Sequence, residues 1–267
     1  MATDLRSFYE TRKTDVTDDD PRFPKILAAA AALLQSPRSV LDIGCGRGAL
    51  LERFRQAFPG ASLYGVDISQ STVDAARARG FDARVADISQ SLPFADAFFE
   101  CVVFGEVIEH LVDPDAALRE ISRVLTPNGT LIVTTPNLAS WFNRLMLLLG
   151  LQPVFTETSL HVNLGRMAPA LGQGGPTQGH LKIFTLGALR EMLEANGFVI
   201  HSISGAPFTQ TTKRAVSKLD EVLARFPRFA SNFVVAAQKT RAPGTRYRLI
   251  SENGPVDIKI PPAGAAS

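Results

Sequence analysis

The sequence has little cysteine: Cys45 and Cys101 are the only two among 267 residues, and both lie in apolar or glycine-rich segments. Two isolated thiols do not form a disulfide framework, so the sequence predicts a protein of the reducing cytoplasm. Long apolar runs are also missing. The longest run, 145–151, is far shorter than the roughly 18 residues that suggest a transmembrane segment. The first twenty residues end in the acidic T-D-D-D and lack the apolar centre of a secretory signal peptide.

An excess of either charge is absent as well, because 28 basic residues face 26 acidic ones and the formal net charge is +2. This balance disfavours a chain that binds nucleic acid through its overall charge. The length suits one large domain, expected over 1–240, and the tail 241–267, rich in proline, glycine and alanine, is expected to be weakly ordered.

The chain does contain short apolar segments that alternate with helical patterns. Strands are expected over 39–43, 62–66, 83–86, 101–104, 130–134, 198–203 and 232–237. Helices are expected over 25–34, 49–57, 71–79, 113–125, 141–149, 186–195 and 212–226. This alternation predicts an α/β fold with a parallel sheet covered by helices on both faces. An irregular stretch of about 137–180 separates the fifth and sixth strands and is expected to form an inserted lid.

A glycine-rich loop follows the first strand in L-D-I-G-C-G-R-G, with Gly44, Gly46 and Gly48 at the expected carboxyl end of the sheet. Glycine is needed where the backbone turns tightly and approaches a ligand. The loop also fits a dinucleotide fingerprint loosely, with Ala49 as its last member, and a plain turn without a ligand is a third interpretation.

Two carboxylates follow the next strands. Asp67 ends the second strand in Y-G-V-D-I-S, and Asp87 precedes Ile88 in V-A-D-I-S. A carboxylate accepts two hydrogen bonds at once, which suits the paired hydroxyls of a ribose. A nicotinamide dinucleotide also carries a ribose at this position, so Asp67 alone leaves the cofactor open.

Together these segments resemble the class I S-adenosylmethionine-dependent methyltransferases. Asp42 stands two residues before Gly44 as in that family, whereas a dinucleotide site usually has an apolar residue there. The resemblance implies a Rossmann-like seven-stranded sheet with a reversed last strand and S-adenosyl-L-methionine as cofactor. Glu100 departs from the family, in which an aspartate is common before the fourth strand. The residues implied to hold the cofactor are Asp42, Gly44, Gly46, Asp67, Ile68, Asp87, Ile88 and Gly105.

The stretch F-G-E-V-I-E-H-L follows the fourth strand and places Glu106, Glu109 and His110 at i, i+3 and i+4, one face of a helix if a helix begins here. Such a face can cap the helix, hold a metal ion or perform acid–base chemistry. With the later G-H-L-K-I-F-T, this segment resembles the ubiquinone-biosynthesis O-methyltransferases and related bacterial small-molecule enzymes. Small-RNA 2′-O-methyltransferases share Glu-x-x-Glu-His, and there it binds metal.

The sequence therefore predicts a methyltransferase that acts on a small molecule, at a hydroxyl oxygen, because oxygen gains from a base or a metal. His110 and Glu109 are the expected catalytic residues, and His180 is a further candidate ligand of a divalent metal. A metal-dependent RNA 2′-O-methyltransferase, an NAD(P)-binding oxidoreductase and a fold without turnover are the alternatives. The apolar stripe of 141–149 suits an apolar or aromatic acceptor, and a membrane role is disfavoured because only Arg144 in it is basic.

Overall fold

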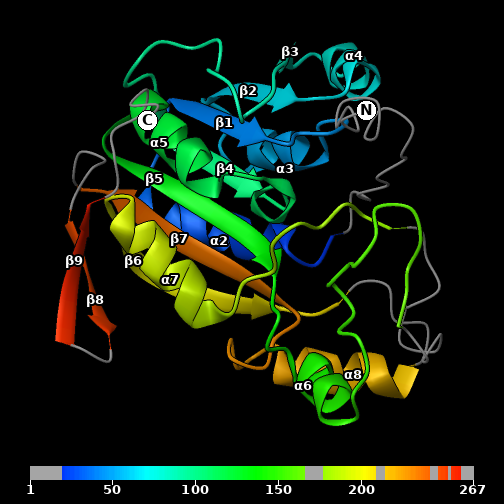
Figure 1. Cartoon of the computed structure of the whole chain (residues 1–267). Helices are drawn as coiled ribbons and strands as arrows, with labels where there is room; N and C mark the ends of the chain where they lie inside the picture. The colour runs from blue at the N-terminus through cyan, green and yellow to red at the C-terminus, as the bar shows by residue number, and fades with distance from the viewer. Residues whose placement is uncertain (1–19, 166–176, 209–213, 241–245, 252–253, 260–267) are drawn as a thin grey trace.

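The computed structural model describes residues 20–165, 177–208, 214–240, 246–251 and 254–259. A seven-stranded sheet with the order β3-β2-β1-β4-β5-β7-β6 forms its centre (Figure 1). The five neighbouring strands β3, β2, β1, β4 and β5 pair in parallel. Strand β7 is antiparallel to both β5 and β6. The expected Rossmann-like α/β fold with a reversed last strand is thereby confirmed. The strands are β1 (Ser39–Ile43), β2 (Ser62–Asp67), β3 (Asp82–Val85), β4 (Phe99–Gly105), β5 (Leu125–Pro136), β6 (Phe198–Ala206) and β7 (Asn232–Lys239).

The helices fall close to their expected positions, because capping residues mark their starts. Side chains of Ser69, Asp113 and Thr185 accept hydrogen bonds from backbone N–H groups in the first turns of α4, α5 and α7. The helices are α2 (Phe23–Leu33), α3 (Ala49–Ala57), α4 (Gln70–Ala78), α5 (Pro114–Val124), α6 (Trp141–Leu148), α7 (Leu186–Ala195) and α8 (Arg214–Leu223).

The core lies on both faces of the sheet because side chains alternate along each strand. In β4, Cys101 and Val103 pack with residues of α2 and α3, whereas Val102 and Phe104 pack with residues of α5 and α7. Strands apolar on both faces belong between two helical layers. The strand ends, not the strand faces, are therefore left for chemistry.

Strand β5 is longer than expected because it absorbs the turn signal T-P-N-G. Leu125 pairs with Phe99, and the next pair is Thr130 with Cys101, so four residues of β5 lie opposite one residue of β4. Asn128 in this bulge has a φ of 61°. The turn residues thus bend the strand locally without ending it.

The inserted segment leaves and rejoins the sheet at one place. Asn137, directly after β5, forms an isolated parallel bridge with Phe184, and the N–H of Leu138 donates to the carbonyl of Phe184 at 2.9 Å. Helix α6 belongs to this insert and lies beside α8 at one end of the molecule (Figure 1). None of the helices in the described part of the chain has the length and apolar character to cross a bilayer.

A separate two-stranded sheet follows the main one. Strand β8 (Arg246–Ser251) pairs antiparallel with β9 (Gly254–Lys259). Strand β8 contains the segment R-Y-R-L-I of the tail that follows residue 240. The remaining tail residues, 241–245, 252–253 and 260–267, lie outside the described residues, so the domain boundary near 240 stays a prediction.

Candidate active site

The glycine-rich loop wraps around the carboxyl end of β2. The N–H groups of Gly44 and Cys45 both donate to the carbonyl of Val66, at 2.8 and 3.0 Å. Gly44, Gly46 and Gly48 have φ values of 79°, 50° and 79°, in the left-handed region that side chains with a Cβ disfavour. The loop thus requires glycine for its own conformation, whichever ligand it meets.

Gly44 and Gly105 meet where the strand order reverses, between β1 and β4. A Cβ on Gly44 would overlap Cγ2 of Val107 and lie 3.7 Å from the carbonyl oxygen of Gly105. Open α/β sheets bind ligands outside the carboxyl ends of the strands at this switch point. The predicted residues Gly44, Gly46 and Gly105 therefore share one end of the sheet.

Asp67 ends β2 and faces the same loop. Its Oδ2 accepts a hydrogen bond from the N–H of Gly46 at 2.9 Å, and its Oδ1 accepts one from the N–H of Ser69 at 2.9 Å. The two bonds fix the orientation of a half-buried carboxylate that retains acceptor capacity on both oxygens. This geometry fits a group with two neighbouring hydroxyls, such as the ribose of the cofactor.

Asp42 lies beneath the loop and is 4% exposed. Burial, and to a smaller extent the charge of Asp67, raise the pKa of its carboxyl to about 8. A carboxyl group in this environment is mostly protonated at neutral pH. Asp42 and Asp67 both belong to the predicted cofactor set, but Asp42 is buried beneath the loop, whereas Asp67 is half-buried and faces it.

Asp87 and Ile88, two of the residues implied to hold the cofactor, follow β3. Asp87 accepts a hydrogen bond from the N–H of Ser89 at 2.9 Å, which closes a turn, and it remains half-buried. Ile88 is 6% exposed and belongs to the main core, so most of its surface packs inside the protein. Ile68 is half-buried directly after Asp67.

The segment after β4 does not form the helix that the spacing of Glu106, Glu109 and His110 left open. Only a single 3₁₀ turn, η1 (Ile108–His110), forms there, and Glu106 precedes it with a φ of 54°. The conditional placement of Glu106, Glu109 and His110 on one α-helical face is therefore wrong. Glu106 instead forms an ion pair with Arg22, and its Oε1 accepts a hydrogen bond from Oγ1 of Thr134 at 2.9 Å.

Glu109 is completely buried. Its Oε2 accepts a hydrogen bond from Oγ1 of Thr135 at 3.0 Å, whereas its Oε1 has no hydrogen-bond partner. Burial raises the pKa of Glu109 well above its usual value, and the charge of Glu106 adds to this rise. The backbone carbonyl of Glu109 accepts bonds from the N–H groups of Leu181 and Lys182, at 2.8 and 2.9 Å. The segment G-H-L-K is thus attached directly to η1.

Two imidazoles meet beside Glu109. The rings of His110 and His180 have centroids 4.9 Å apart, at an angle of 47°. Nδ1 of His110 lies 3.1 Å from the carbonyl oxygen of Gly179, and Nδ1 of His180 lies 2.8 Å from that of Phe155. A carbonyl only accepts, so each Nδ1 carries the proton. In each neutral ring, Nε2 therefore holds the lone pair that a base or a metal ligand uses.

The cluster also fits a cation. One ligand atom each from Glu109, His110 and His180 lie within 4.8 Å of one another. The buried Oε1 of Glu109 lacks a hydrogen bond, and a metal ion satisfies such an atom. Two imidazoles and one carboxylate suit zinc or another transition ion better than magnesium. Glu106 is not part of this group.

Arg22 is the site-supporting residue that the sequence did not reveal. It precedes α2, and its guanidinium pairs with Asp20 and with Glu106 across 84 positions of sequence. The interval 18–24 has only a loop pattern, and no local spacing connects it to η1. Thr135 was missed for a similar reason, because a threonine in a strand is ordinary.

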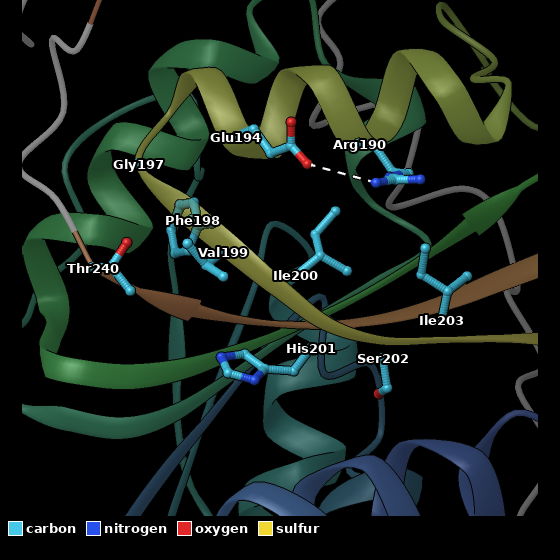
Figure 2. Close-up of a pocket in the computed structure, with 10 residues that line it drawn as sticks. All are labelled: Arg190, Glu194, Gly197, Phe198, Val199, Ile200, His201, Ser202, Ile203 and Thr240. Carbon is cyan, nitrogen blue, oxygen red and sulfur yellow. Dashed lines mark ion pairs between the residues drawn. The ribbon is translucent and has the colours of Figure 1, made fainter.

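A separate pocket of about 530 Å³ lies along the edge strand β6 (Figure 2). Arg190 and Glu194 form an ion pair at its rim, with 3.9 Å between the charged atoms. Val199, half-exposed, and Thr240 also line it. None of the predicted site residues contributes to this pocket, so it stands apart from the carboxyl edge of the parallel strands.

Comparison with known proteins agrees with this geometry. A family model described as "Methyltransferase domain" matches residues 17–203. The chain therefore belongs to this methyltransferase family, which confirms the resemblance found in the sequence. Methyltransferases with this loop and sheet order are S-adenosylmethionine-dependent enzymes, and the loop, Asp67 and Asp87 fit that cofactor.

Three individual proteins illustrate the relationship. A malonyl-[acyl-carrier protein] O-methyltransferase of Hahella chejuensis is 31% identical over 198 residues, which cover 69% of either chain. The human mitochondrial ubiquinone biosynthesis O-methyltransferase is 29% identical over 62% of this chain and 42% of its own. The structure of an S-adenosylmethionine-dependent methyltransferase of Mesorhizobium loti has a TM-score of 0.57 and 20% identity, covering 83% of this chain and 99% of its own. At that identity the structural match shows the fold alone.

The chain spans only part of most of these relatives. Three further curated relatives align over 36, 42 and 50% of their own lengths. The acceptor of this protein is therefore a matter for proposal.

Proposed function

We propose that this protein transfers the methyl group of S-adenosylmethionine to an oxygen atom of a small-molecule acceptor. The observation that carries the proposal is the cluster of Glu109, His110 and His180 at the carboxyl edge of the sheet. A hydroxyl acceptor gains from a base or a metal that favours its deprotonated form, whereas an amine or a carboxylate needs neither. Relatives named as O-methyltransferases of ubiquinone biosynthesis support the same acceptor atom.

In this proposal the glycine loop and the carboxylates hold the cofactor. Asp67 binds the ribose hydroxyls, Asp87 accepts from the adenine amine with Ile88 beside the ring, and Gly44 and Gly105 admit the backbone close to the ligand. The bound cofactor supplies an activated methyl group on a sulfonium. The chain's main task is alignment, since methyl transfer is a direct displacement.

His110 is the proposed general base. Its Nδ1 donates to the carbonyl of Gly179, and Nε2 is the atom proposed to accept the proton of the acceptor hydroxyl. The acceptor oxygen then forms a bond to the methyl carbon while the carbon–sulfur bond breaks, and the former sulfonium leaves as a neutral thioether. Glu109 is proposed to assist the His110 ring as a neighbouring buried carboxyl group. One of its carboxyl oxygens lies within 4.8 Å of a ring nitrogen of His110 and of a ring nitrogen of His180.

A metal ion is the second candidate for the same step. Glu109, His110 and His180 would hold it, and it would act as a Lewis acid that lowers the pKa of the acceptor hydroxyl. The unpartnered Oε1 of Glu109 favours this reading. The RNA 2′-O-methyltransferase alternative also needs a metal. It is disfavoured because relatives of this chain are named as a ubiquinone biosynthesis O-methyltransferase and a malonyl-[acyl-carrier protein] O-methyltransferase.

The acceptor is proposed to carry an apolar or aromatic part. Phe142 of α6, Phe155 and Phe208 form an aromatic group, with ring centroids 5.3 to 6.0 Å apart. Phe155 also contacts His180, at 6.3 Å between centroids. The inserted segment of about 137–180 therefore acts as a lid over the acceptor. The location of the protein in the cytoplasm stays a prediction.

The base and the metal are separated by one experiment. Purified protein is incubated with S-adenosylmethionine carrying a labelled methyl group and a panel of phenolic small molecules, and mass spectrometry and NMR identify the methylated atom. For a base, EDTA leaves the rate unchanged, and His110→Ala lowers it at least 100-fold, within the usual range for acid–base catalysis. His201→Ala, a change at an exposed histidine of β6, serves as the control and retains the rate.

For a metal, EDTA stops turnover, and Zn²⁺, Mn²⁺ or Mg²⁺ restores it. Metal analysis of the purified protein then finds one equivalent that is lost in His180→Ala. If the labelled methyl group appears on nitrogen or carbon, the oxygen proposal is wrong. If His110→Ala has full activity, both roles of the cluster are excluded.

A further inference from the structure

Helix α6 exposes an unusual number of leucines. Leu145 and Leu148, three residues apart on one face of α6, have exposed fractions of 48 and 82%, and Leu149, the residue that follows the helix, is 64% exposed. The opposite face, with Phe142 and Met146, is buried in the aromatic group of the lid. The helix therefore presents apolar side chains in both directions, and only one direction is satisfied inside the protein.

A second apolar row lies in α8 and the turns that follow it. Leu219, Val222, Phe226 and Phe229 are exposed by 46, 49, 59 and 43%. Leu219 and Val222 stand three residues apart on one side of α8, and Phe226 and Phe229 follow in the turns after it. Isolated exposed apolar residues need no explanation, but two rows on neighbouring helices form a surface.

The two rows are fixed to each other by Asp220, which is 1% exposed. Its Oδ1 accepts hydrogen bonds from Nε1 of Trp141 at 2.8 Å and from Oγ of Ser231 at 2.7 Å. The N–H of Trp141 donates to the carbonyl of Phe229 at 3.0 Å, and the guanidinium of Arg144 lies over the Phe229 ring at 5.4 Å. Helices α6 and α8 thus form one unit, which lies at one end of the molecule (Figure 1).

Basic side chains accompany the apolar rows. Lys218, Arg225 and Arg228 are exposed. They directly precede Leu219, Phe226 and Phe229 of the second apolar row. None of these three cations forms an ion pair with another described residue. Arg144 on α6 is exposed as well. Helix α6 alone has a single cation, but the fold adds Lys218, Arg225 and Arg228 to the same unit. We call the exposed parts of α6 and of 218–229 the lid surface.

We propose that the lid surface docks on an anionic lipid bilayer. Leucine and phenylalanine on one face with lysine and arginine beside them is the pattern of helices that lie in a membrane interface. The cations would meet anionic headgroups, and the apolar rows would enter the boundary of the acyl chains. A second copy of this chain is a poorer occupant, because it would bring the same positive charges against one another.

Vesicle sedimentation tests the proposal with the full chain. Vesicles of phosphatidylglycerol mixed with phosphatidylcholine are expected to bind the protein, and vesicles of phosphatidylcholine alone to bind it much less. Leu148→Glu should reduce binding to the mixed vesicles at least tenfold. Val199→Glu, the same kind of change at an exposed apolar residue of β6, should not reduce it. Circular dichroism confirms that both variants are folded.

The charge requirement has its own matched pair. Replacing Lys218, Arg225 and Arg228 together by glutamine should weaken binding about 100-fold, since each cation near an anionic surface contributes about fivefold. Replacing Arg38, Arg77 and Arg190 by glutamine changes the net charge equally and should leave binding intact. Equal losses in the two triple variants would show attraction through overall charge only and would overturn the proposal.

Trp141 reports the orientation, because it is the only tryptophan and lies at the start of α6. Brominated phosphatidylglycerol vesicles should quench its fluorescence in the unmodified protein. Absence of binding to anionic vesicles overturns the proposal. A concentration-dependent dimer that Leu148→Glu abolishes, without vesicle binding, would assign the lid surface to a second copy instead.

Discussion

The Asp42 carboxyl couples the cofactor loop to pH. Its pKa is raised to about 8 by burial and by the charge of Asp67, whereas an aspartate in an unfolded chain titrates near 3.9. Between these values the native state holds a proton that the unfolded state has lost. The free energy of unfolding therefore falls as pH rises from about 4 to about 8, by up to about 1.4 kcal/mol per pH unit from this group.

Asp42→Asn is expected to remove this slope, because the amide is similar in size and cannot ionise. Compared with the unmodified protein, the variant should gain stability progressively between pH 5 and pH 8. Urea unfolding monitored by circular dichroism at four pH values measures the difference. Asp74→Asn, at an exposed carboxyl of α4, should keep the original slope. A slope unchanged in Asp42→Asn would mean that Asp42 is ionised in the folded protein.

The loop between β1 and α3 offers a test of where the cofactor lies. Gly46 has a φ of 50°, and a Cβ built on it meets no atom within 4 Å. Gly46→Ala should therefore lower stability by only about 1–2 kcal/mol, the cost of a left-handed residue. The added methyl group would occupy space that the proposal gives to the cofactor. Affinity for S-adenosylhomocysteine, measured by calorimetry, should fall at least tenfold.

Gly80 provides the matched control, because it has a φ of 85° and equally open surroundings, in the turn after α4. Gly80→Ala carries a similar backbone strain and should leave the affinity unchanged. If both variants bind the cofactor product normally, the glycine loop does not approach it.

Helices and strands whose bounds follow from neighbouring residues were predicted from the sequence. Segments whose conformation depends on residues far away in the sequence were not. Strand β1 and helices α3 and α7 have the expected bounds. An apolar run defines β1, the glycine-rich loop precedes α3, and the cap Thr185 marks the start of α7. The helix that the spacing of Glu106, Glu109 and His110 left open does not form: one 3₁₀ turn lies there, and α5 begins at Pro114. The backbone at Glu106 is left-handed, and its partner Arg22 lies far away in sequence.

The candidate site follows the same division. The glycines and carboxylates that follow successive parallel strands meet at one edge because the topology brings strand ends together, so the cofactor set was accessible to sequence reasoning. The burial of Glu109 was not, because its hydrogen bond to Thr135 depends on how β5 packs beside η1. Helix α8 likewise lies beside α6 only after folding (Figure 1).

The whole molecule is organised around β7, which pairs with both β5 and β6. Lys239, at its end, donates to the carbonyls of Ser122 and Leu125 at 2.5 and 2.9 Å. A chain ended after Thr240 keeps these contacts and should unfold cooperatively with a stability close to that of the full chain. A chain ended after Ala230 loses the strand that connects β6 to the rest and should not fold.

Denaturant titration of both truncated chains measures this difference. A full-length protein that is more stable than 1–240 by several kcal/mol would place the β8–β9 hairpin within the domain and move the proposed boundary.

The bridge between Asn137 and Phe184 brings the two ends of the inserted segment together. The chain enters and leaves this insert at adjacent backbone positions, so a segment of different length can be grafted between them without changing the register of β5 or β6. The methyl-donor half of the molecule would then remain constant while the graft alters which acceptors are admitted. Acceptor range in such a scaffold can diversify by exchange of a single contiguous stretch of gene.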